Sequence, residues 1–229
     1  HGREDRISLP VRFADDARGI LRDNPLDSYL DIEAVIAAAK SMGVDAVHPG
    51  YGFLAENAEF VRRLEEEGIT FIGPSSDVIR LLGDKIEARK AMEAAGLPVA
   101  KGSSEPVSTS EEAILLAEEI GYPVIIKAAA GGGGIGMQIV HEAGEFTSAL
   151  NLCQSRARSA FGDDRVFVEK YIEGAQHIEF QVLADGKRAI HFGERFCSIQ
   201  RRHQKLLEEG PWLDEEVRAD IGAKVCAGA

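Results

Sequence analysis

The 229-residue sequence has few cysteines, namely Cys153, Cys197 and Cys226, and no CxxC pair. So sparse and odd a set predicts reduced thiols rather than a disulfide framework, and its spacing offers no metal site. No apolar run reaches the roughly 18 residues of a membrane helix, so we expect no membrane association. The sequence also lacks a signal-peptide pattern, internal repeats and low-complexity segments other than one glycine run.

Basic residues are in the minority, with 26 Lys and Arg against 38 Asp and Glu and a net charge of -12. This balance excludes sequence-independent nucleic-acid binding, which rests on cations that neutralise phosphates. A local cationic pocket for a nucleotide remains compatible with it. With 45% hydrophobic residues the chain can bury a core. Because it begins with His1 and its last stretch has a helical pattern without a stop signal, we expect a segment of a longer protein.

The first half of the chain repeats one pattern, in which an apolar-periodic helix ends at a glycine and a short apolar run follows. A glycine after a helix takes the left-handed conformation without a Cβ penalty. The pattern predicts α/β architecture, with the first two strands in a parallel sheet. The expected helix and strand pairs are residues 32–43 and 44–48, 54–68 and 69–72, 86–96 and 97–100, and 111–121 and 122–127.

The pattern changes after residue 124, where strands follow one another and predict a second, α+β unit. Asp185-Gly186-Lys187 is a hairpin turn signal between the last two of these strands. The expected elements are strands at residues 124–128, 137–140, 166–172, 178–184 and 188–200, with a helix over 144–160.

Residues 131–136 read Gly-Gly-Gly-Gly-Ile-Gly and match the spacing G-x-G-x-x-G. A dinucleotide-binding fingerprint would open a helix, whereas a strand-like segment follows here, and no P-loop sequence is present. A glycine loop between two strands suits a flap that offers backbone N–H groups to phosphates. The alternative is a flexible hairpin turn, but four glycines lose much backbone entropy on ordering, which favours the phosphate interpretation.

The neighbours of this loop resemble those of the ATP-grasp fold. They are Gly83-Asp84-Lys85, the strand that ends at Lys127, and Glu169-Lys170-Tyr171-Ile172. Residues 48–57 (HPGYGFLAEN) and 194–209 (ERFCSIQRRHQKLLEE) are further similar to signatures of the biotin carboxylases. The resemblance covers essentially the whole chain. It implies a Rossmann-like pre-ATP-grasp domain over residues 1–82 and an α+β ATP-grasp domain over 83–229, with a glycine-rich lid over about 99–171.

The resemblance assigns an ATP site. Lys85 and Lys127 would face the phosphates as point charges, although either could be a solvated surface lysine. Backbone groups near residue 170 would read adenine, although an ordinary ion pair on a half-exposed strand is the alternative. His177 would bind the ribose. The implied ATP residues are Lys85, Lys127, Gly131, Gly132, Gly133, Gly134, Gly136, Met137, Glu169, Lys170, Ile172, His177, Gln200 and His203.

Lys205 is the residue that the resemblance assigns to bicarbonate, with His203 beside it as a further catalytic candidate. A basic cluster at residues 201–205 in so acidic a chain favours an anion site over a solvated surface. Tyr51 and Gly52 match the turn that contacts biotin, although Pro-Gly-Tyr-Gly also makes a tight turn on steric grounds alone.

The implied activity is the carboxylation of biotin on a carrier protein from ATP and bicarbonate, through carboxyphosphate. The family places its Mg²⁺ (or Mn²⁺) ligands, its base and its biotin-site arginines beyond residue 229, so we expect no metal ligand here and an inactive isolated chain. Implied partners are a biotin carboxyl carrier protein and a carboxyltransferase, with homodimerisation, in the cytoplasm or the mitochondrial matrix. The alternatives are another ATP-grasp ligase, such as a carbamoyl-phosphate synthetase, and an inactive regulatory protein. The second is supported by Ile135, which stands where the family usually has a cation.

Overall fold

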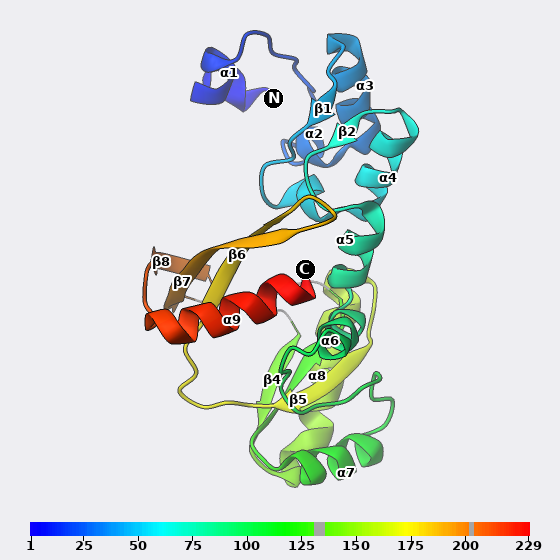
Figure 1. The fold of residues 1–229 in the computed structure, drawn as a ribbon. Coiled ribbons are helices and arrows are strands. Elements are labelled where there is room, and N and C mark those ends of the chain that lie inside the picture. Colours follow the sequence, from blue (N-terminus) through cyan, green and yellow to red (C-terminus); the bar gives the residue numbers. More distant parts are fainter. Residues whose placement is uncertain (131–135, 202–203) are drawn as a thin grey trace. The chain divides into compact units, whose positions relative to one another are not determined.

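The computed structural model describes residues 1–130, 136–201 and 204–229. Contacts between Cα atoms divide the chain into two units, His1–Gly83 and Asp84–Ala229, each of which is described by itself. Together they form a mixed α/β chain with one parallel and two antiparallel sheets, which confirms the predicted fold class (Figure 1). No helix of the described residues has both the length and the apolar character of a membrane span.

The first unit builds a small core around two parallel strands. Strand β1 (Ala46–Val47) pairs with β2 (Thr70–Phe71), as predicted. Ile36, Phe60 and Leu64 fill the core and are almost fully buried. The helices of this unit are η1 (Glu4–Ile7), α1 (Leu9–Phe13), α2 (Asp27–Leu30), α3 (Ile32–Met42), η2 (Phe53–Glu56), α4 (Ala58–Glu66) and α5 (Ser76–Gly83).

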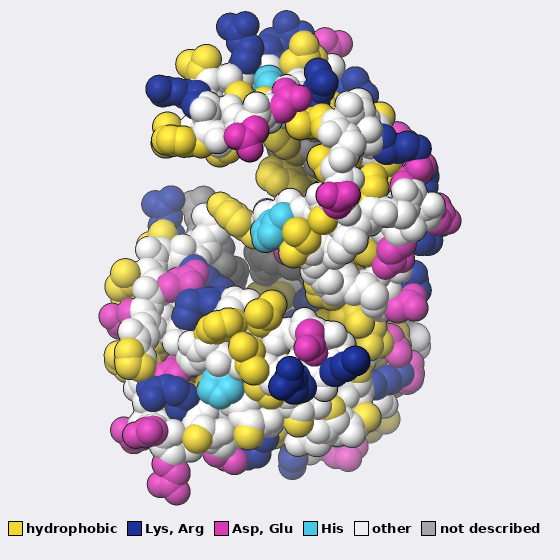
Figure 2. Space-filling model, turned by 45° about the horizontal axis from the view of Figure 1, so that its top comes forward, with side chains coloured by type: hydrophobic (Ala, Val, Ile, Leu, Met, Phe, Trp, Pro, Cys, Tyr) yellow, Lys and Arg dark blue, Asp and Glu magenta, His cyan; other side chains and the backbone are white. Residues whose placement is uncertain are grey.

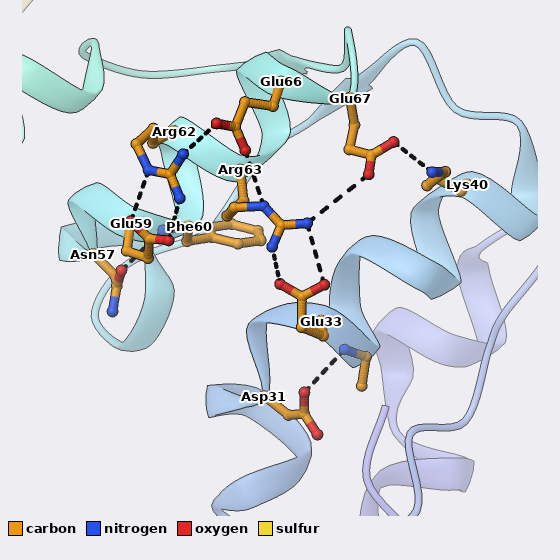
Figure 3. A network of polar contacts seen from close by, with 11 residues as sticks. Asp31, Glu33, Lys40, Asn57, Glu59, Phe60, Arg62, Arg63, Glu66 and Glu67 are labelled. Carbon is orange, nitrogen blue, oxygen red and sulfur yellow. Dashed lines mark hydrogen bonds and ion pairs between the residues drawn. The ribbon is translucent and has the colours of Figure 1, made fainter.

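Helices α3 and α4 are joined at their surfaces by a network of ion pairs (Figure 3). Arg63 on α4 contacts Glu33 on α3, and Lys40 near the end of α3 contacts Glu67 just after α4. Asp31 and Asn57 cap the two helices. The side-chain oxygen of each accepts a hydrogen bond, 2.9 Å long, from the backbone N–H of the residue three positions later. Such caps satisfy backbone donors that the first helical turn leaves unpaired.

The second unit contains two antiparallel sheets. The first has the order β4-β3-β5, and α7 and α8 pack against it; the second has the order β6-β7-β8, and α9 packs against it. The elements are α6 (Lys85–Ala94), α7 (Ser110–Ile120), β3 (Val124–Ala128), β4 (Met137–Val140), α8 (Ala143–Phe161), β5 (Val166–Lys170), β6 (Ile178–Ala184), β7 (Ala189–Arg201), β8 (Gln204–Glu209) and α9 (Glu215–Gly228).

Alternation along β3 separates the core face of the first sheet from its other face. Val124 and Ile126 are completely buried in the core beneath α7 and α8, together with Val168 of β5. Because successive side chains of a strand point to opposite faces, Ile125 and Lys127 point the other way. That second face carries the candidate site described below.

A buried carboxylate attaches α9 to the second sheet. Glu194 of β7 is 5% exposed, and Arg218 of α9 contacts it at 2.6 and 2.9 Å. The backbone N–H groups of Trp212 and Leu213 donate to the same carboxylate at 2.7 and 2.8 Å. Ion pairing with Arg218, supported by the two N–H bonds, holds the pKa of Glu194 far below its usual range despite burial. The carboxylate therefore fixes the connection between β8 and α9.

Acidic and basic side chains both occur across the face of the molecule shown in Figure 2. The net charge of -12 therefore reflects an excess of acidic over basic side chains, and in this view the acidic ones are interspersed with basic ones and do not form a single acidic face.

Two expectations about single elements are wrong. Residues 97–100, expected as a strand, have no regular secondary structure; the Leu97 N–H instead donates to the Met92 carbonyl at the end of α6, at 2.9 Å. The expected helix over residues 54–68 is divided at Asn57 into η2 and α4, because the Asn57 side chain caps α4.

Candidate active site

The face of the β4-β3-β5 sheet opposite α7 and α8 forms a pocket lined by residues from each of its strands. The register places Ile125 between Ile139 and Glu169, and Lys127 opposite Met137. The lining residues are Ala100, Ile125, Lys127, Met137, Gln138, Ile139, Glu169, Lys170, Tyr171, Ile172 and Ala175. Five residues predicted to bind ATP therefore line one pocket. The strand alternation explains why apolar side chains and a charged pair share this face.

Lys127 and Glu169 form an ion pair in this pocket, with Nζ and Oε2 2.5 Å apart. The side chains are 29% and 16% exposed, respectively. Arg89 of α6 contacts the other carboxylate oxygen of Glu169 at 3.3 Å and is only 12% exposed. Nothing in its sequence surroundings marks Arg89 as a site residue, because it lies in an ordinary amphipathic helix.

Lys85 lies close to Lys127 because the first residue of α6 is hydrogen-bonded to the chain just after the end of β3. The Lys85 N–H donates to the Ala129 carbonyl at 3.3 Å, and Nζ donates to the Ala128 carbonyl at 3.4 Å. Burial, together with the positive charge of Lys127, lowers the pKa of Lys85. Two cations that repel each other in a partly buried place are stabilised by a bound anion. The arrangement therefore suits a phosphate group.

The segment predicted to bind adenine, residues 169–172, is attached to the rest of its unit by a backbone hydrogen bond and by the side chain of Lys170. The Lys170 ammonium donates to the carbonyls of Gly121 and Tyr122, both at 2.9 Å, at the end of α7. Its backbone N–H donates to the Lys101 carbonyl at 2.7 Å. The side chain of Lys170 is thus engaged in the fold, whereas Ile172 is 59% exposed.

A second group of predicted residues meets on the β6-β7-β8 sheet. His177 Nδ1 and Gln200 Nε2 are 2.8 Å apart, and His177 Nε2 lies 3.3 Å from Glu179. Gln200 and Lys205 are directly opposite each other in the β7-β8 pair. Lys205 donates to Glu179. One carboxylate thus joins the predicted ribose ligand to the predicted bicarbonate ligand.

Glu179 and Arg195 complete this group and were not predicted. They face each other across β6 and β7, and Arg195 contacts both Glu179 and Glu208, the latter at 2.9 Å. Burial would raise the pKa of Glu179, but the hydrogen bonds and charges of Lys205 and Arg195 outweigh burial and lower it to about 2. Opposite charges at facing positions of the predicted hairpin were the available signal.

Glu179, Cys197 and Glu208 bring their ligand atoms within 4.8 Å of one another, which the sequence spacing did not reveal. Each of the two carboxylates already contacts a cationic side chain, so the cluster is balanced by ion pairs. Burial raises the pKa of the Cys197 thiol and favours its neutral form, a poor metal ligand.

The other predicted site residues are Tyr51, Gly52, the glycines of residues 131–136 and His203. Tyr51 and Gly52 belong to the other unit, where Tyr51 is 95% exposed and Gly52 has φ +67°. Gly136 is described, and its carbonyl accepts a bond from the Ala128 N–H at 3.0 Å. Gly131, Gly132, Gly133, Gly134 and His203, like Ile135, lie outside the described residues.

Comparison with known proteins identifies the two units. Residues 84–227 match the family model of the carbamoyl-phosphate synthase L chain, ATP binding domain. Together with the pocket, this match defines the class of protein, an ATP-grasp protein. Residues 1–79 match the biotin carboxylase N-terminal domain. The chain belongs to the biotin carboxylase family.

Individual relatives agree with this assignment. The chain is 47% identical over 228 residues to a biotin carboxylase of Pseudomonas aeruginosa, a match over 98% of this chain and 51% of that protein. It is 48% identical over 232 residues to one of the pyruvate carboxylase subunits of Methanothermobacter thermautotrophicus, over 100% of this chain and 47% of that protein. The chain thus spans about half the length of these curated relatives.

Solved structures show the same fold. A biotin carboxylase from Campylobacter jejuni in complex with a β,γ-ATP ligand has a TM-score of 0.95 and 44% identity over 100% of this chain and 52% of its own. The biotin carboxylase domain dimer of Hydrogenobacter thermophilus 2-oxoglutarate carboxylase was solved with MgADP, ADP and bicarbonate. It has a TM-score of 0.94 and 45% identity, over 100% of this chain and 51% of its own.

Proposed function

We propose that this chain supplies the nucleotide-binding and bicarbonate-binding part of a biotin carboxylase. In the proposed reaction the γ-phosphoryl group of ATP is transferred to a bicarbonate oxygen and ADP leaves. The carboxyphosphate formed breaks down to CO₂ and inorganic phosphate, and N1′ of biotin loses its proton and takes up the CO₂. The observation that carries the proposal is the shared pocket of Lys127, Met137 and Glu169, with a second cation, Lys85, near Lys127. The bound nucleotides of the related structures support it.

The pocket divides the work between apolar and charged groups. Ile125, Met137 and Ile139 offer apolar surface to a flat base, whereas Lys127 and Lys85 supply the charge that phosphates require. We assign residues of about 99–171, which include most of those lining the pocket, to a glycine-rich lid whose strands and helices share one core. The ATP and bicarbonate roles of the glycine loop, His177, Gln200, His203 and Lys205 are part of this proposal.

The remaining parts of the reaction are also proposals. Biotin would contact Tyr51 and Gly52, and a carrier protein would present it, with a carboxyltransferase as the next enzyme. Magnesium, which would bridge the phosphate oxygens, is assigned no ligand in this chain. We propose a homodimer, as in the Hydrogenobacter thermophilus domain. The unpaired cysteines support a reducing compartment, which we take to be the cytoplasm.

Replacement of Lys205 tests the bicarbonate role. In the entire gene product, Lys205→Ala should lower bicarbonate-dependent ATP cleavage about 100-fold or more, because a cation that stabilises transferring charge is lost. ATP binding should stay unchanged. Lys224→Ala is the matched control, since Lys224 is an exposed lysine whose ion pair among the described residues is with Asp220 within α9. Unchanged cleavage in Lys205→Ala would remove Lys205 from the mechanism, and a lack of stimulation by free biotin would favour another ATP-grasp ligase.

A further inference from the structure

Glu169 is shared by two cations that reach it from different elements. Lys127 of β3 contacts Oε2 at 2.5 Å, and Arg89 of α6 contacts Oε1 at 3.3 Å. All three side chains are mostly buried, with exposed fractions of 29% for Lys127, 16% for Glu169 and 12% for Arg89. Lys127 lines the pocket, whereas Arg89 approaches the carboxylate from α6 and is not among the lining residues.

The backbone leaves room for this approach at Gly102. Gly102 forms an isolated antiparallel bridge with Glu169. A Cβ atom at position 102 would lie 2.5 Å from the Val168 carbonyl oxygen and 2.8 Å from the Arg89 guanidinium. It would also lie 2.9 Å from Cγ of Glu169. A side chain here would disturb the arginine and the carboxylate together, so the contact is built into the fold rather than being an incidental surface pair.

The two cations differ in what they can do when a nucleotide arrives. Lys127 is a flexible point charge at the pocket, so its ammonium can turn from Glu169 to a phosphate. A mostly buried carboxylate left without a partner is strongly unfavourable, and that cost would oppose the turn. Arg89 is held in place between Gly102 and Glu169 and keeps the carboxylate paired when Lys127 leaves.

We propose that Arg89 is a positioning residue for nucleotide binding, which holds Glu169 so that Lys127 is available to the phosphates of ATP. The inference rests on the proposed ATP site and adds a residue that acts through Glu169 without touching the nucleotide. It requires that Arg89 contribute to the affinity for the phosphates of the ligand and not to the affinity for its adenosine part.

The test compares ATP with adenosine, by NMR titration of the chain, which also measures weak binding. Arg89→Met keeps the length of the side chain and removes its charge, and should weaken ATP about tenfold while it changes adenosine less than about twofold. Arg89→Lys restores a cation and should recover part of the ATP affinity. Lys90→Met is the control, because Lys90 is the next residue of α6 and, in the part of the chain that the structure describes, pairs with Glu87 and Glu105 outside the pocket.

A double-mutant cycle separates this role from general support of the fold. In a Glu169→Gln background no carboxylate remains to hold Lys127, so Arg89→Met should no longer change the ratio of ATP to adenosine affinity. Equal losses for the two ligands in Arg89→Met, or no loss for either, would overturn the positioning role while leaving the ATP site intact. Failure of the unaltered chain to bind ATP would instead overturn the proposed function and this inference with it.

Discussion

Glu179 remains ionised at a pH where an ordinary glutamate is largely protonated. Its pKa falls from 4.5 to about 2 because Lys205 and Arg195 more than offset the cost of burial. A carboxylate whose pKa is lower in the folded state than in the unfolded state stabilises the fold at pH values above the unfolded-state pKa. This contribution is lost as the pH falls through the folded-state pKa. The relevant window lies between about pH 4.5 and pH 2.

We therefore expect Glu179→Gln to lower the free energy of unfolding by about 2 kcal/mol at pH 7, because two cations lose their partner. The difference from the unaltered chain should shrink as pH falls from 4.5 towards 2, where the natural side chain is protonated too. Urea unfolding at a series of pH values measures it. Asp77→Asn is a suitable control, since Asp77 is 84% exposed and its pair with Arg80 contributes little. A difference that grows towards acid pH would contradict the assignment.

At the scale of the element, the features that the sequence predicted are those that neighbouring residues determine, such as helix ends and tight turns. The helix ending at Gly43 was predicted because glycine tolerates the left-handed conformation, and Gly43 has φ +62°. Likewise Asp185 and Gly186 form the predicted turn between β6 and β7, where the Asp185 N–H donates to the Arg188 carbonyl at 3.1 Å. Thr109 caps α7 in the same short-range way, since its side-chain oxygen accepts a hydrogen bond from the Glu112 N–H at 3.2 Å.

Elements without a periodic signal were missed. Strand β8 is exposed along its whole described length, so no alternation of apolar and polar residues marks it. It pairs with β7 directly along the chain, which places Lys205 opposite Gln200, but no Gly, Asn, Asp or Pro marks the connection between the two strands. For the same reason the candidate site was predicted through the motifs of a resembling family, whereas Arg89, Glu179 and Arg195 were not. The role of Arg89 depends on the meeting of α6 and β5, which no local pattern shows. The roles of Glu179 and Arg195 depend on the register of the β6-β7 hairpin.

The packing of α9 on β7 depends on a glycine that the sequence pattern did not single out. A Cβ atom at Gly222 would lie 2.3 Å from Nε2 of His191, so the helix lies against the imidazole ring. Gly222→Ala should lower the free energy of unfolding by about 1–3 kcal/mol, because an added methyl group must displace a packed ring or the helix. Thermal and urea unfolding measure the loss.

Two further variants make this prediction specific. Gly144→Ala in α8 is the matched control, since a Cβ there meets nothing closer than 4.0 Å, and alanine should be neutral or slightly stabilising. In a His191→Ala background the ring is absent and Gly222→Ala should lose most of its cost. If Gly222→Ala remains equally destabilising without His191, the contact is not its cause.

At the scale of the whole chain, the proposed tasks divide between the two units. The nucleotide pocket is lined by residues that all belong to Asp84–Ala229, as do the groups around Glu179. The predicted biotin turn at Tyr51 and Gly52 belongs to His1–Gly83. The family resemblance implied domains of residues 1–82 and 83–229, whereas the change from alternating helices and strands to successive strands lies later, after residue 124.

The division predicts that damage to the first core spares nucleotide binding. Leu64 is completely buried among Ile36, Phe60 and Ile69, so Leu64→Ala should cost His1–Gly83 about 2–5 kcal/mol by leaving a cavity. Hydrogen exchange should become faster in α3 and α4 and stay unchanged in β3 and β5, because the latter strands belong to the other core. ATP affinity should also stay unchanged.

The matched variant in the second unit should behave in the opposite way. Val168 is completely buried on β5, directly before Glu169, and Val168→Ala should accelerate exchange in β3 and β5 and weaken ATP binding, with α3 and α4 unaffected. Because each core is closed by its own residues, each substitution should report on one unit alone. Faster exchange throughout the chain in Leu64→Ala would show instead that the two units unfold as one cooperative body, and the separation of tasks would then not extend to stability.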